Sequence, residues 1–201
     1  DQMADDPATE ILDATYRALC EHGYANLTLQ DIATEADTSK GSIHYHYDSK
    51  DQLFVAFLDE LYERFTDRVN SRDGDTPREQ LEALLQVLLT TDADSSLRAF
   101  RTAMLELTAQ APYNSTLQER LTDFDEFLIE QLREILAAGV DTGEFDDNIN
   151  PVHDAEYLAT TITGAHTRHV AINHSSDQLY DTMTRYIERQ LLADEQAEVA
   201  Q

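Results

Sequence analysis

The sequence predicts an all-α protein of about nine helices, and three features of the chain support this fold class. Apolar residues recur at spacings of three and four along nearly all of the 201 residues, which is typical of one face of a helix. Ser, Thr and Asn, which favour the position before a helix, precede several of these stretches. The alternating run SIHYHY, residues 42–47, resembles a strand, but it has no partner strand and is too short to stand alone.

Two helices are expected in the first 36 residues. The first carries an apolar face up to Leu19 and ends before Gly23, because Gly favours the position just past a helix. Thr28 begins a short second helix that runs through Ala36. Asp31 stands three residues after Thr28 and completes a capping box, so the start of this helix is well defined by local chemistry.

Two further helices are expected before residue 70. Ser39 caps a third, short helix that runs to about Tyr47. Ser49 caps a longer fourth helix, with Gln52 three residues on and an apolar stripe that reaches Val69. The small helices at the N-terminus are therefore followed directly by a long one.

Five more helices are expected in the rest of the chain. DGDTP, residues 73–77, is a linker, and helical apolar patterns follow over residues 81–88, 97–107 and 117–135. GVDTGEFDDNINP, residues 139–151, is rich in turn residues, and its Asn-Pro end begins a helix that reaches about residue 173. The last helix covers about residues 177–193. We expect the chain to divide into an N-terminal unit of small helices over 1–50 and a larger helical bundle over 51–201.

The charge of the chain is strongly negative, with 40 acidic and 14 basic residues and a formal net charge of -26. Such a surface repels nucleic acids and anionic membranes at low salt. At about 1 M salt the Debye length falls to about 3 Å, so this repulsion is largely screened. Because the acidic residues are spread over the whole chain, we interpret them as the adaptation of a halophilic protein. The only two lysines are Lys40 and Lys50.

Several classes of protein do not fit the sequence. The single cysteine, Cys20, allows no disulfide within the chain. No apolar run approaches the roughly 18 residues of a membrane span, and the acidic start DQMADDPATE is not a signal peptide, so we expect a cytoplasmic protein that contacts no membrane. No nucleophile motif, phosphate loop or paired catalytic carboxylate stands out. We therefore expect no enzymatic activity, cofactor or metal.

The first three helices have the layout of a helix-turn-helix, in which the later helix enters the major groove of DNA. Residues 23–53, GYANLTLQDIATEADTSKGSIHYHYDSKDQL, resemble the DNA-binding signature of the TetR/AcrR family of transcriptional regulators. The matching positions are Gly23-Tyr24, Thr28, Ile32-Ala33, residues 39–47 and residues 49–53. The rest of the chain agrees with this family in length and helical content.

The resemblance implies a set of DNA contacts. Thr28 and Lys50 would bind phosphates, and Lys40 and Gly41 would approach base edges. The full set of expected DNA-binding residues is Thr28, Thr38, Ser39, Lys40, Gly41, Ser42, His44, Tyr45, His46 and Lys50. Asp37 departs from the family, because it replaces the usual turn Gly, although Asp tolerates a left-handed backbone better than most residues. His44 stands where Tyr is usual.

The resemblance also implies a DNA-binding helix-turn-helix domain over 1–50 and an effector-binding and dimerisation domain over 51–201. It implies an effector pocket in the middle of the bundle and a homodimer. The expected pocket residues are Phe100, Met104, Thr108, Phe124, Phe127, Leu128 and His166. Two features of the last two helices predict the dimer seam: a stripe of small residues that permits close approach, and bulky residues from the final helix. These residues are Ala155, Ala159, Ile162, Ala165, Leu179, Met183, Tyr186 and Ile187.

The favoured hypothesis is a ligand-responsive repressor that binds a palindromic double-stranded DNA operator as a homodimer and is released by a small-molecule effector. One alternative is a helical metal-dependent enzyme that uses His153, His166, His169 and nearby carboxylates, although these histidines fit a polar patch in a pocket or dimer seam better. The other alternative is a small-molecule sensor without DNA binding, which Asp37 and the acidity favour.

Overall fold

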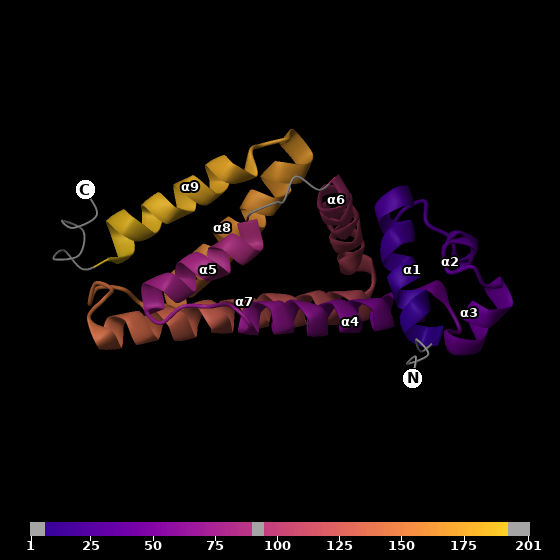
Figure 1. Cartoon of the computed structure of the whole chain (residues 1–201), viewed down its shortest axis with the longest axis horizontal. Helices are drawn as coiled ribbons and strands as arrows, with labels where there is room; N and C mark the ends of the chain where they lie inside the picture. The colour runs from indigo at the N-terminus through magenta and orange to yellow at the C-terminus, as the bar shows by residue number, and fades with distance from the viewer. Residues whose placement is uncertain (1–6, 90–94, 193–201) are drawn as a thin grey trace. The chain divides into compact units, whose positions relative to one another are not determined.

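The computed structural model describes residues 7–89 and 95–192. Within these residues the chain forms nine α-helices and a single isolated β-bridge, between Phe145 and Leu192, which confirms the all-α fold class (Figure 1). The chain divides into two compact units. The N-terminal unit holds the described parts of residues 1–64 and 93–123, and the C-terminal unit holds those of residues 65–92 and 124–201.

The N-terminal unit contains the expected helix-turn-helix. Its elements are α1 (Pro7–His22), α2 (Leu29–Glu35), α3 (Lys40–His46), the first turns of α4 (Lys50–Asn70), α6 (Ser95–Gln110), the 3-10 turn η1 (Ala111–Tyr113) and the start of α7 (Ser115–Thr142). α1 contacts α2 and α6, and α2 contacts α3. The buried core of this unit includes Ile11, Leu19, Leu27, Ile32, Ile43, Leu53, Phe54, Phe57, Leu58, Leu107 and Leu117.

The local signals at the helix ends act as the sequence predicts. Gly23 ends α1 with φ +70°. The backbone N–H of Thr28 donates to the Asp31 carboxylate at 2.8 Å, and the backbone N–H of Asp31 donates to the Thr28 hydroxyl at 3.2 Å, which confirms the capping box. Asp37 takes the left-handed backbone expected of it, with φ 48°. The Ser39 hydroxyl caps α3, so SIHYHY belongs to a helix.

The C-terminal unit is a helical bundle. Its elements are the end of α4, α5 (Pro77–Leu89), the rest of α7, α8 (Pro151–Ile172), α9 (Ser176–Tyr186) and the π-helical turn η2 (Ile187–Leu191). α5 contacts both α8 and α9. α8 begins at Pro151 as expected, and the Asn150 side chain is its N-cap. The buried core includes Leu81, Leu84, Leu85, Leu132, Leu136, Phe145, Leu158, Ile162, Met183 and Ile187.

The packing boundary lies further along the chain than residue 50. Leu53, Phe54 and Phe57, in the first turns of α4, are buried in the core of the N-terminal unit, and Leu107 of α6 joins them. The division of function at residue 50 stays a prediction. The helix-turn-helix is nevertheless packed as one body with α6 and the beginning of α4.

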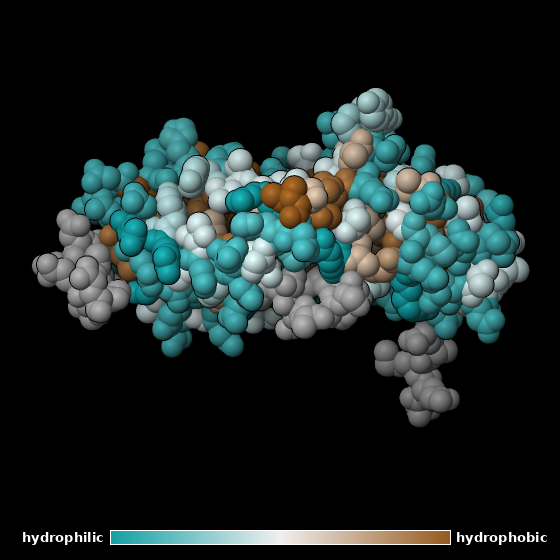
Figure 2. Space-filling model, turned by 90° about the horizontal axis from the view of Figure 1, so that it is seen from above, coloured by the Kyte–Doolittle hydropathy of each residue, from teal (hydrophilic) through white to brown (hydrophobic). Residues whose placement is uncertain are grey.

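The surface is consistent with the acidic composition. Hydrophilic residues cover most of the face seen in Figure 2. None of the helices in the described parts of the chain combines the length and the apolar character needed to cross a membrane.

Candidate nucleic-acid interface

The short helix α3 is held in place by one buried side chain. Ile43 is 0% exposed and lies in the core of the N-terminal unit, whereas Tyr45 is 86% exposed. Lys40, Gly41, His44 and His46 are exposed as well, and Ser39 caps the helix with its hydroxyl at 3.0 Å from the Ser42 N–H. A helix anchored on one residue therefore presents nearly all of its other side chains to solvent.

The exposed side of α3 carries groups that suit DNA. An ammonium, two imidazoles, a phenol and several hydroxyls lie within seven residues and their cap. The Tyr45 ring meets the His46 ring edge-on, with centroids 5.2 Å apart. Such groups donate hydrogen bonds to phosphate oxygens and to base edges in the major groove.

Lys40 supplies the accessible positive charge of the helix-turn-helix. Among residues 7–50, Arg17 pairs with Glu35 at 2.7 Å, and the Lys50 ammonium is bound to backbone carbonyls. Lys40 is exposed and forms no ion pair with a described residue. We therefore expect the interaction with phosphates to depend strongly on this one side chain.

Thr28 is already engaged in the capping box. Its hydroxyl lies 2.6 Å from the Asp31 carboxylate and donates to it, and its backbone N–H binds the same oxygen. These hydrogen bonds from Thr28 lower the pKa of Asp31, so a negative charge stays beside the hydroxyl. Phosphate binding by Thr28 stays a prediction. A phosphate would have to compete with the Asp31 carboxylate for the Thr28 hydroxyl. Thr38 is partly buried, and its backbone N–H binds the Ala33 carbonyl at 2.9 Å.

Lys50 does not lie with the exposed groups of α3. Its Nζ donates to the carbonyl oxygens of Leu27 at 2.6 Å and Tyr24 at 3.1 Å, and it lies over the Tyr24 ring at 4.7 Å from the centroid. Burial lowers the pKa of Lys50, and the carboxylates of Asp51 and Asp31 oppose this shift. The side chain expected to bind a phosphate is thus occupied by the loop between α1 and α2.

The expected effector residues fall into two separate hydrophobic clusters. Phe100 and Met104 pack on the core of the N-terminal unit, where the Phe100 ring lies 5.0 Å from the Tyr16 ring. Thr108 is exposed and donates to the Met104 carbonyl of its own helix at 2.8 Å. Each of these three residues therefore has a local structural role.

The remaining effector residues belong to the C-terminal unit. The rings of Phe124 and Phe127 both pack near the Phe65 ring, with centroids 5.6 and 5.8 Å away, and Leu128 is buried. His166 Nε2 lies 2.9 Å from the Leu88 carbonyl oxygen. Three of the seven expected residues therefore lie in the N-terminal unit and four in the C-terminal unit, and the pocket assignment stays a prediction.

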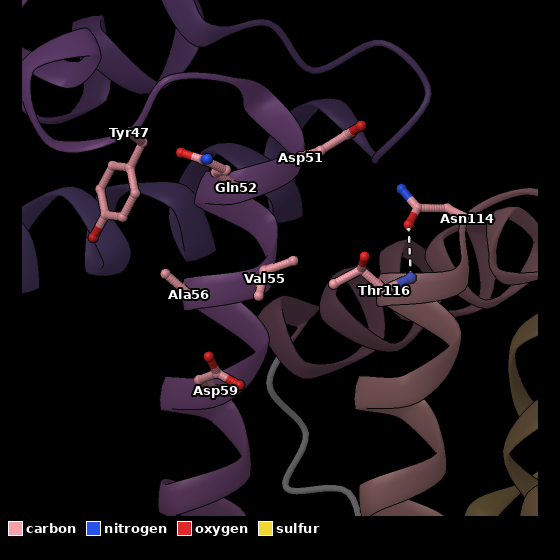
Figure 3. A pocket seen from close by; sticks show the side chains of 8 residues that line it. All are labelled: Tyr47, Asp51, Gln52, Val55, Ala56, Asp59, Asn114 and Thr116. Atoms are coloured by element: carbon pink, nitrogen blue, oxygen red, sulfur yellow. Dashed lines mark hydrogen bonds between the residues drawn. The ribbon is translucent and has the colours of Figure 1, made fainter.

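A groove that the sequence did not predict lies within the N-terminal unit, beside the start of α4 (Figure 3). Its volume is about 430 Å³. Its lining residues are Tyr47, Asp51, Gln52, Val55, Ala56, Asp59, Asn114 and Thr116. Two of its polar groups are already used, because Asp59 pairs with Arg120 at 2.6 Å and the Asn114 side chain caps the start of α7. Sequence reasoning missed the groove because its two walls are more than fifty residues apart in the chain.

The residues expected at the dimer seam are buried within the subunit itself. Ala155, Ala159, Ile162 and Ala165 are at most 4% exposed, and Leu179, Met183 and Ile187 lie in the same core. The stripe of small residues thus packs α8 into its own unit, and the dimer seam stays a prediction. Tyr186 is only partly buried, and its ring lies 5.5 Å from that of Tyr157. A seam on α8 and α9 would have to use exposed side chains such as Val152, Tyr157 and Ile172.

The metal hypothesis requires His153, His166 or His169 to lie within a group of side chains that could bind a metal ion together. Over residues 7–89 and 95–192, no group of three or more His, Cys, Asp and Glu side chains is arranged to hold a metal ion. His153 is exposed, and His169 Nδ1 lies 2.9 Å from the His174 carbonyl oxygen. These side chains have ordinary structural surroundings.

A tight trihelical unit with a polar, exposed third helix defines a helix-turn-helix DNA-binding protein. Comparisons with known proteins agree. Residues 11–57 match the family described as "Bacterial regulatory proteins, tetR family", and residues 77–192 match "BetI-type transcriptional repressor, C-terminal". The chain belongs to the TetR family of transcriptional regulators, which are not enzymes.

Individual relatives support the same assignment. The transcriptional repressor KstR2 of Rhodococcus jostii is 32% identical over 148 residues, which are 71% of this chain and 69% of that protein. A TetR regulator from Haloarcula marismortui has a crystal structure that is 37% identical, with a TM-score of 0.85 over 92% of this chain and 98% of that one. A regulator from Saccharomonospora viridis, solved in complex with choline, shares the fold with a TM-score of 0.83 at 22% identity over 92% of this chain and 97% of that one.

Proposed function

We propose that the protein is a homodimeric repressor that binds a palindromic operator and leaves it when a small-molecule effector binds. The observation that carries the proposal is the exposed face of α3, which is anchored by Ile43 and begins with the accessible Lys40. The match to a repressor family in the C-terminal half and the relative named as a repressor support the direction of regulation. An operator on chromosomal DNA would place the protein in the cytoplasm.

In the proposed complex, each subunit inserts α3 into the major groove of one half-site. Lys40 and the backbone at Gly41 approach base edges at the start of the helix, where the lack of a side chain at Gly41 permits close contact. Tyr45 and His46, at the other end of α3, reach phosphates. The palindrome follows from the two-fold symmetry of the dimer.

The proposed switch acts on the distance between the two copies of α3. α4 begins directly after the helix-turn-helix, so a change in its direction would move α3. The effector must bind the state with the wrong spacing more tightly than the operator-binding state, because a ligand shifts an equilibrium only by its difference in affinity. Choline is a reasonable first compound to test, since a protein of the same fold was solved with it.

We further propose that the protein works at high salt. Its net charge of -26 opposes DNA binding at low salt, and the Haloarcula marismortui protein is a relative at 37% identity. Ordinary regulators lose affinity steeply as salt rises, because their binding releases counterions. A protein with one accessible cation in its helix-turn-helix has few counterions to release, so we expect a shallow salt dependence and operator binding in molar KCl.

The test is a footprint on the DNA upstream of the coding region of this protein, in about 1 M KCl, where the Debye length is about 3 Å. We expect a protected palindrome, bound by a dimer whose mass is measured by light scattering. Lys40→Ala is expected to abolish or greatly weaken protection and to leave the dimer intact, because it removes the accessible ammonium of α3. Full protection by Lys40→Ala, or no protected site for the natural protein, would contradict the proposal.

A further inference from the structure

The loop between α1 and α2 is held by side chains from two other helices of the N-terminal unit. Lys50, in the first turn of α4, binds the loop through its carbonyl oxygens. The carboxylate of Glu106, on α6, accepts a hydrogen bond from a backbone N–H of the loop. The loop covers residues 23–27 and leads directly into Thr28, the N-cap of α2.

The Lys50 ammonium has little capacity left for another partner. Two of its three donor hydrogens are directed at the carbonyls of Leu27 and Tyr24. The aromatic rings of Tyr24 and Phe54 lie 4.7 and 5.7 Å from Nζ, so the charge is also stabilised by ring faces. A phosphate would have to bind the one remaining hydrogen of a half-buried group.

Glu106 holds the same loop at a different residue. Its Oε2 accepts a hydrogen bond from the Ala25 N–H at 3.3 Å. A Cβ at Gly23 would lie 2.8 Å from that oxygen, and Gly23 has φ +70°. The loop backbone therefore rests directly on the carboxylate, and the left-handed φ of Gly23 favours glycine at this position.

The loop in turn sets the position of α3, the recognition helix that is proposed to enter the major groove. Leu27 is 2% exposed in the core, and its N–H binds the Gly23 carbonyl at 3.2 Å, so the loop is a rigid connection. α2 begins at its end, and α2 contacts α3. A displacement of the loop relative to α4 or α6 is a displacement of the whole helix-turn-helix.

We propose that Lys50 and Glu106 are positioning residues for operator binding, and that Lys50 acts through the loop rather than as a phosphate contact. The proposal rests on the DNA binding proposed above. It divides the only two lysines of the chain by role: Lys40 meets the DNA, and Lys50 holds the unit that carries Lys40.

The salt dependence of binding separates the two roles of lysine. The slope of log affinity against log salt is negative, and each lost phosphate contact lowers its absolute value by about 0.9. We expect Lys50→Met to weaken operator binding about tenfold with an unchanged slope, and the matched variant Lys40→Met to lower the absolute value of the slope by about 0.9. Fluorescence anisotropy measures both over a KCl range in which circular dichroism shows the variants folded. A fall of about 0.9 in this absolute value for Lys50→Met would overturn the proposal.

A pair of substitutions at Glu106 separates positioning from charge. Glu106→Gln keeps an oxygen that accepts from Ala25, so its operator affinity is expected to stay within about twofold of the natural protein. Glu106→Ala removes the acceptor and is expected to weaken binding several-fold, although it removes a negative charge. Stronger binding by both variants would show that Glu106 acts only by repelling DNA, and it would overturn the role assigned to Glu106.

Hydrogen exchange on the free protein gives a readout that needs no DNA. Lys50→Met and Glu106→Ala are expected to raise exchange several-fold in a peptide covering residues 23–31, with peptides of the C-terminal unit unchanged. Unchanged exchange over 23–31 in both variants would overturn the inference even if the operator is found. If the natural protein binds no operator, the proposed function fails, whereas the exchange experiment still decides whether these residues hold the loop.

Discussion

Asp37 combines a backbone shape that favours glycine with a negative charge next to the recognition helix. Its φ of 48° lies in the left-handed region, which Asp and Asn tolerate better than other residues with a side chain. The turn between α2 and α3 is therefore kept without Gly. The charge has no such structural purpose in the turn, and it lies close to where a phosphate backbone would pass.

Asp37→Asn is expected to keep the fold and to strengthen operator binding at low salt. For a phosphate about 10 Å away in water, the removed repulsion is about 0.4 kcal/mol, or about twofold in affinity. The gain should vanish in about 1 M KCl, where the Debye length is about 3 Å. Anisotropy titrations at both salt concentrations measure it. An equal gain at both would mean that Asn contacts the DNA directly.

Gly139 lies in α7 beneath a buried ring. A Cβ built there would overlap with Cδ2 of the Phe145 ring, which is 1% exposed. Replacing a helical Gly by Ala normally stabilises by about 1 kcal/mol, whereas overpacking a core costs about 1–3 kcal/mol. Because the ring is enclosed and must shift, we expect overpacking to win and Gly139→Ala to lower the free energy of unfolding by about 1–2 kcal/mol.

Gly164 provides the matched control for this substitution. It lies in α8, is exposed, and has no atom within 4 Å of the position a Cβ would take. Gly164→Ala is expected to raise the free energy of unfolding by about 0.5–1 kcal/mol, which is the intrinsic helix preference. Urea unfolding in KCl measures both variants. Equal effects at the two positions would show that Phe145 does not restrict Gly139.

At the scale of single elements, the short helix α2 depends on its cap. It has only seven residues, so its own hydrogen bonds provide little stability. Thr28 and Asp31 bind each other's backbone N–H groups at its start. Thr28→Ala is therefore expected to cost about 1 kcal/mol of stability, which chemical denaturation would show.

The capping box also predicts a dependence on pH. Hydrogen bonds from the Thr28 side chain and backbone lower the pKa of Asp31 in the folded protein. A group whose folded pKa is depressed stabilises the protein above its unfolded pKa of about 3.9, and this contribution disappears as pH falls through the folded pKa. NMR titration of the Asp31 carboxyl should show a midpoint below 3.9. In Thr28→Ala the midpoint should return toward that value, and an unchanged midpoint would contradict the assignment.

Helix positions could be predicted from the sequence because their signals are local. Caps at Thr28, Ser39 and Asn150, together with the left-handed turn at Asp37, act through atoms a few residues away. The buried side of α3 is also decided locally, by one apolar residue, Ile43. Helix boundaries and the buried side of a short helix thus depend on residues that are close together in the sequence.

The partners of side chains across the chain could not be predicted in this way. Lysine is a residue type that commonly binds phosphates. The Lys50 ammonium is instead bound by carbonyl oxygens of a loop more than twenty residues earlier in the chain, which the local sequence does not indicate. The small residues of α8 fit a helix contact, and a sequence pattern does not say whether the contacted helix belongs to the same subunit. Burial of Ala155 and Ala159 in the subunit core answers that question.

At the scale of the whole molecule, the acidic surface is the dominant feature. The net charge of -26 is distributed over a chain whose described ion pairs have side chains 28–52% exposed. Exposed pairs of this kind contribute little, about 0–1 kcal/mol each. They do not offset the mutual repulsion of the unpaired carboxylates, which destabilises the compact state when salt is low.

Folding is therefore expected to require salt. Raising KCl from about 0.1 M to about 1 M shortens the Debye length from about 10 Å to about 3 Å, so carboxylates on neighbouring turns cease to repel one another strongly. We expect the thermal unfolding midpoint to rise over this range and to level off above it. Calorimetry or circular dichroism across a KCl series measures the midpoint.

A comparison of chloride and sulfate salts shows whether charge screening causes the expected rise of the unfolding midpoint. Screening depends on ionic strength alone, whereas salts such as sulfate also stabilise proteins by being excluded from their surface, an effect that keeps growing with concentration. If repulsion dominates, chloride and sulfate salts at equal ionic strength should give nearly the same midpoint up to about 1 M. A much higher midpoint in sulfate, with little change in chloride, would mean that the carboxylates do not limit stability and that the acidic surface serves solubility instead.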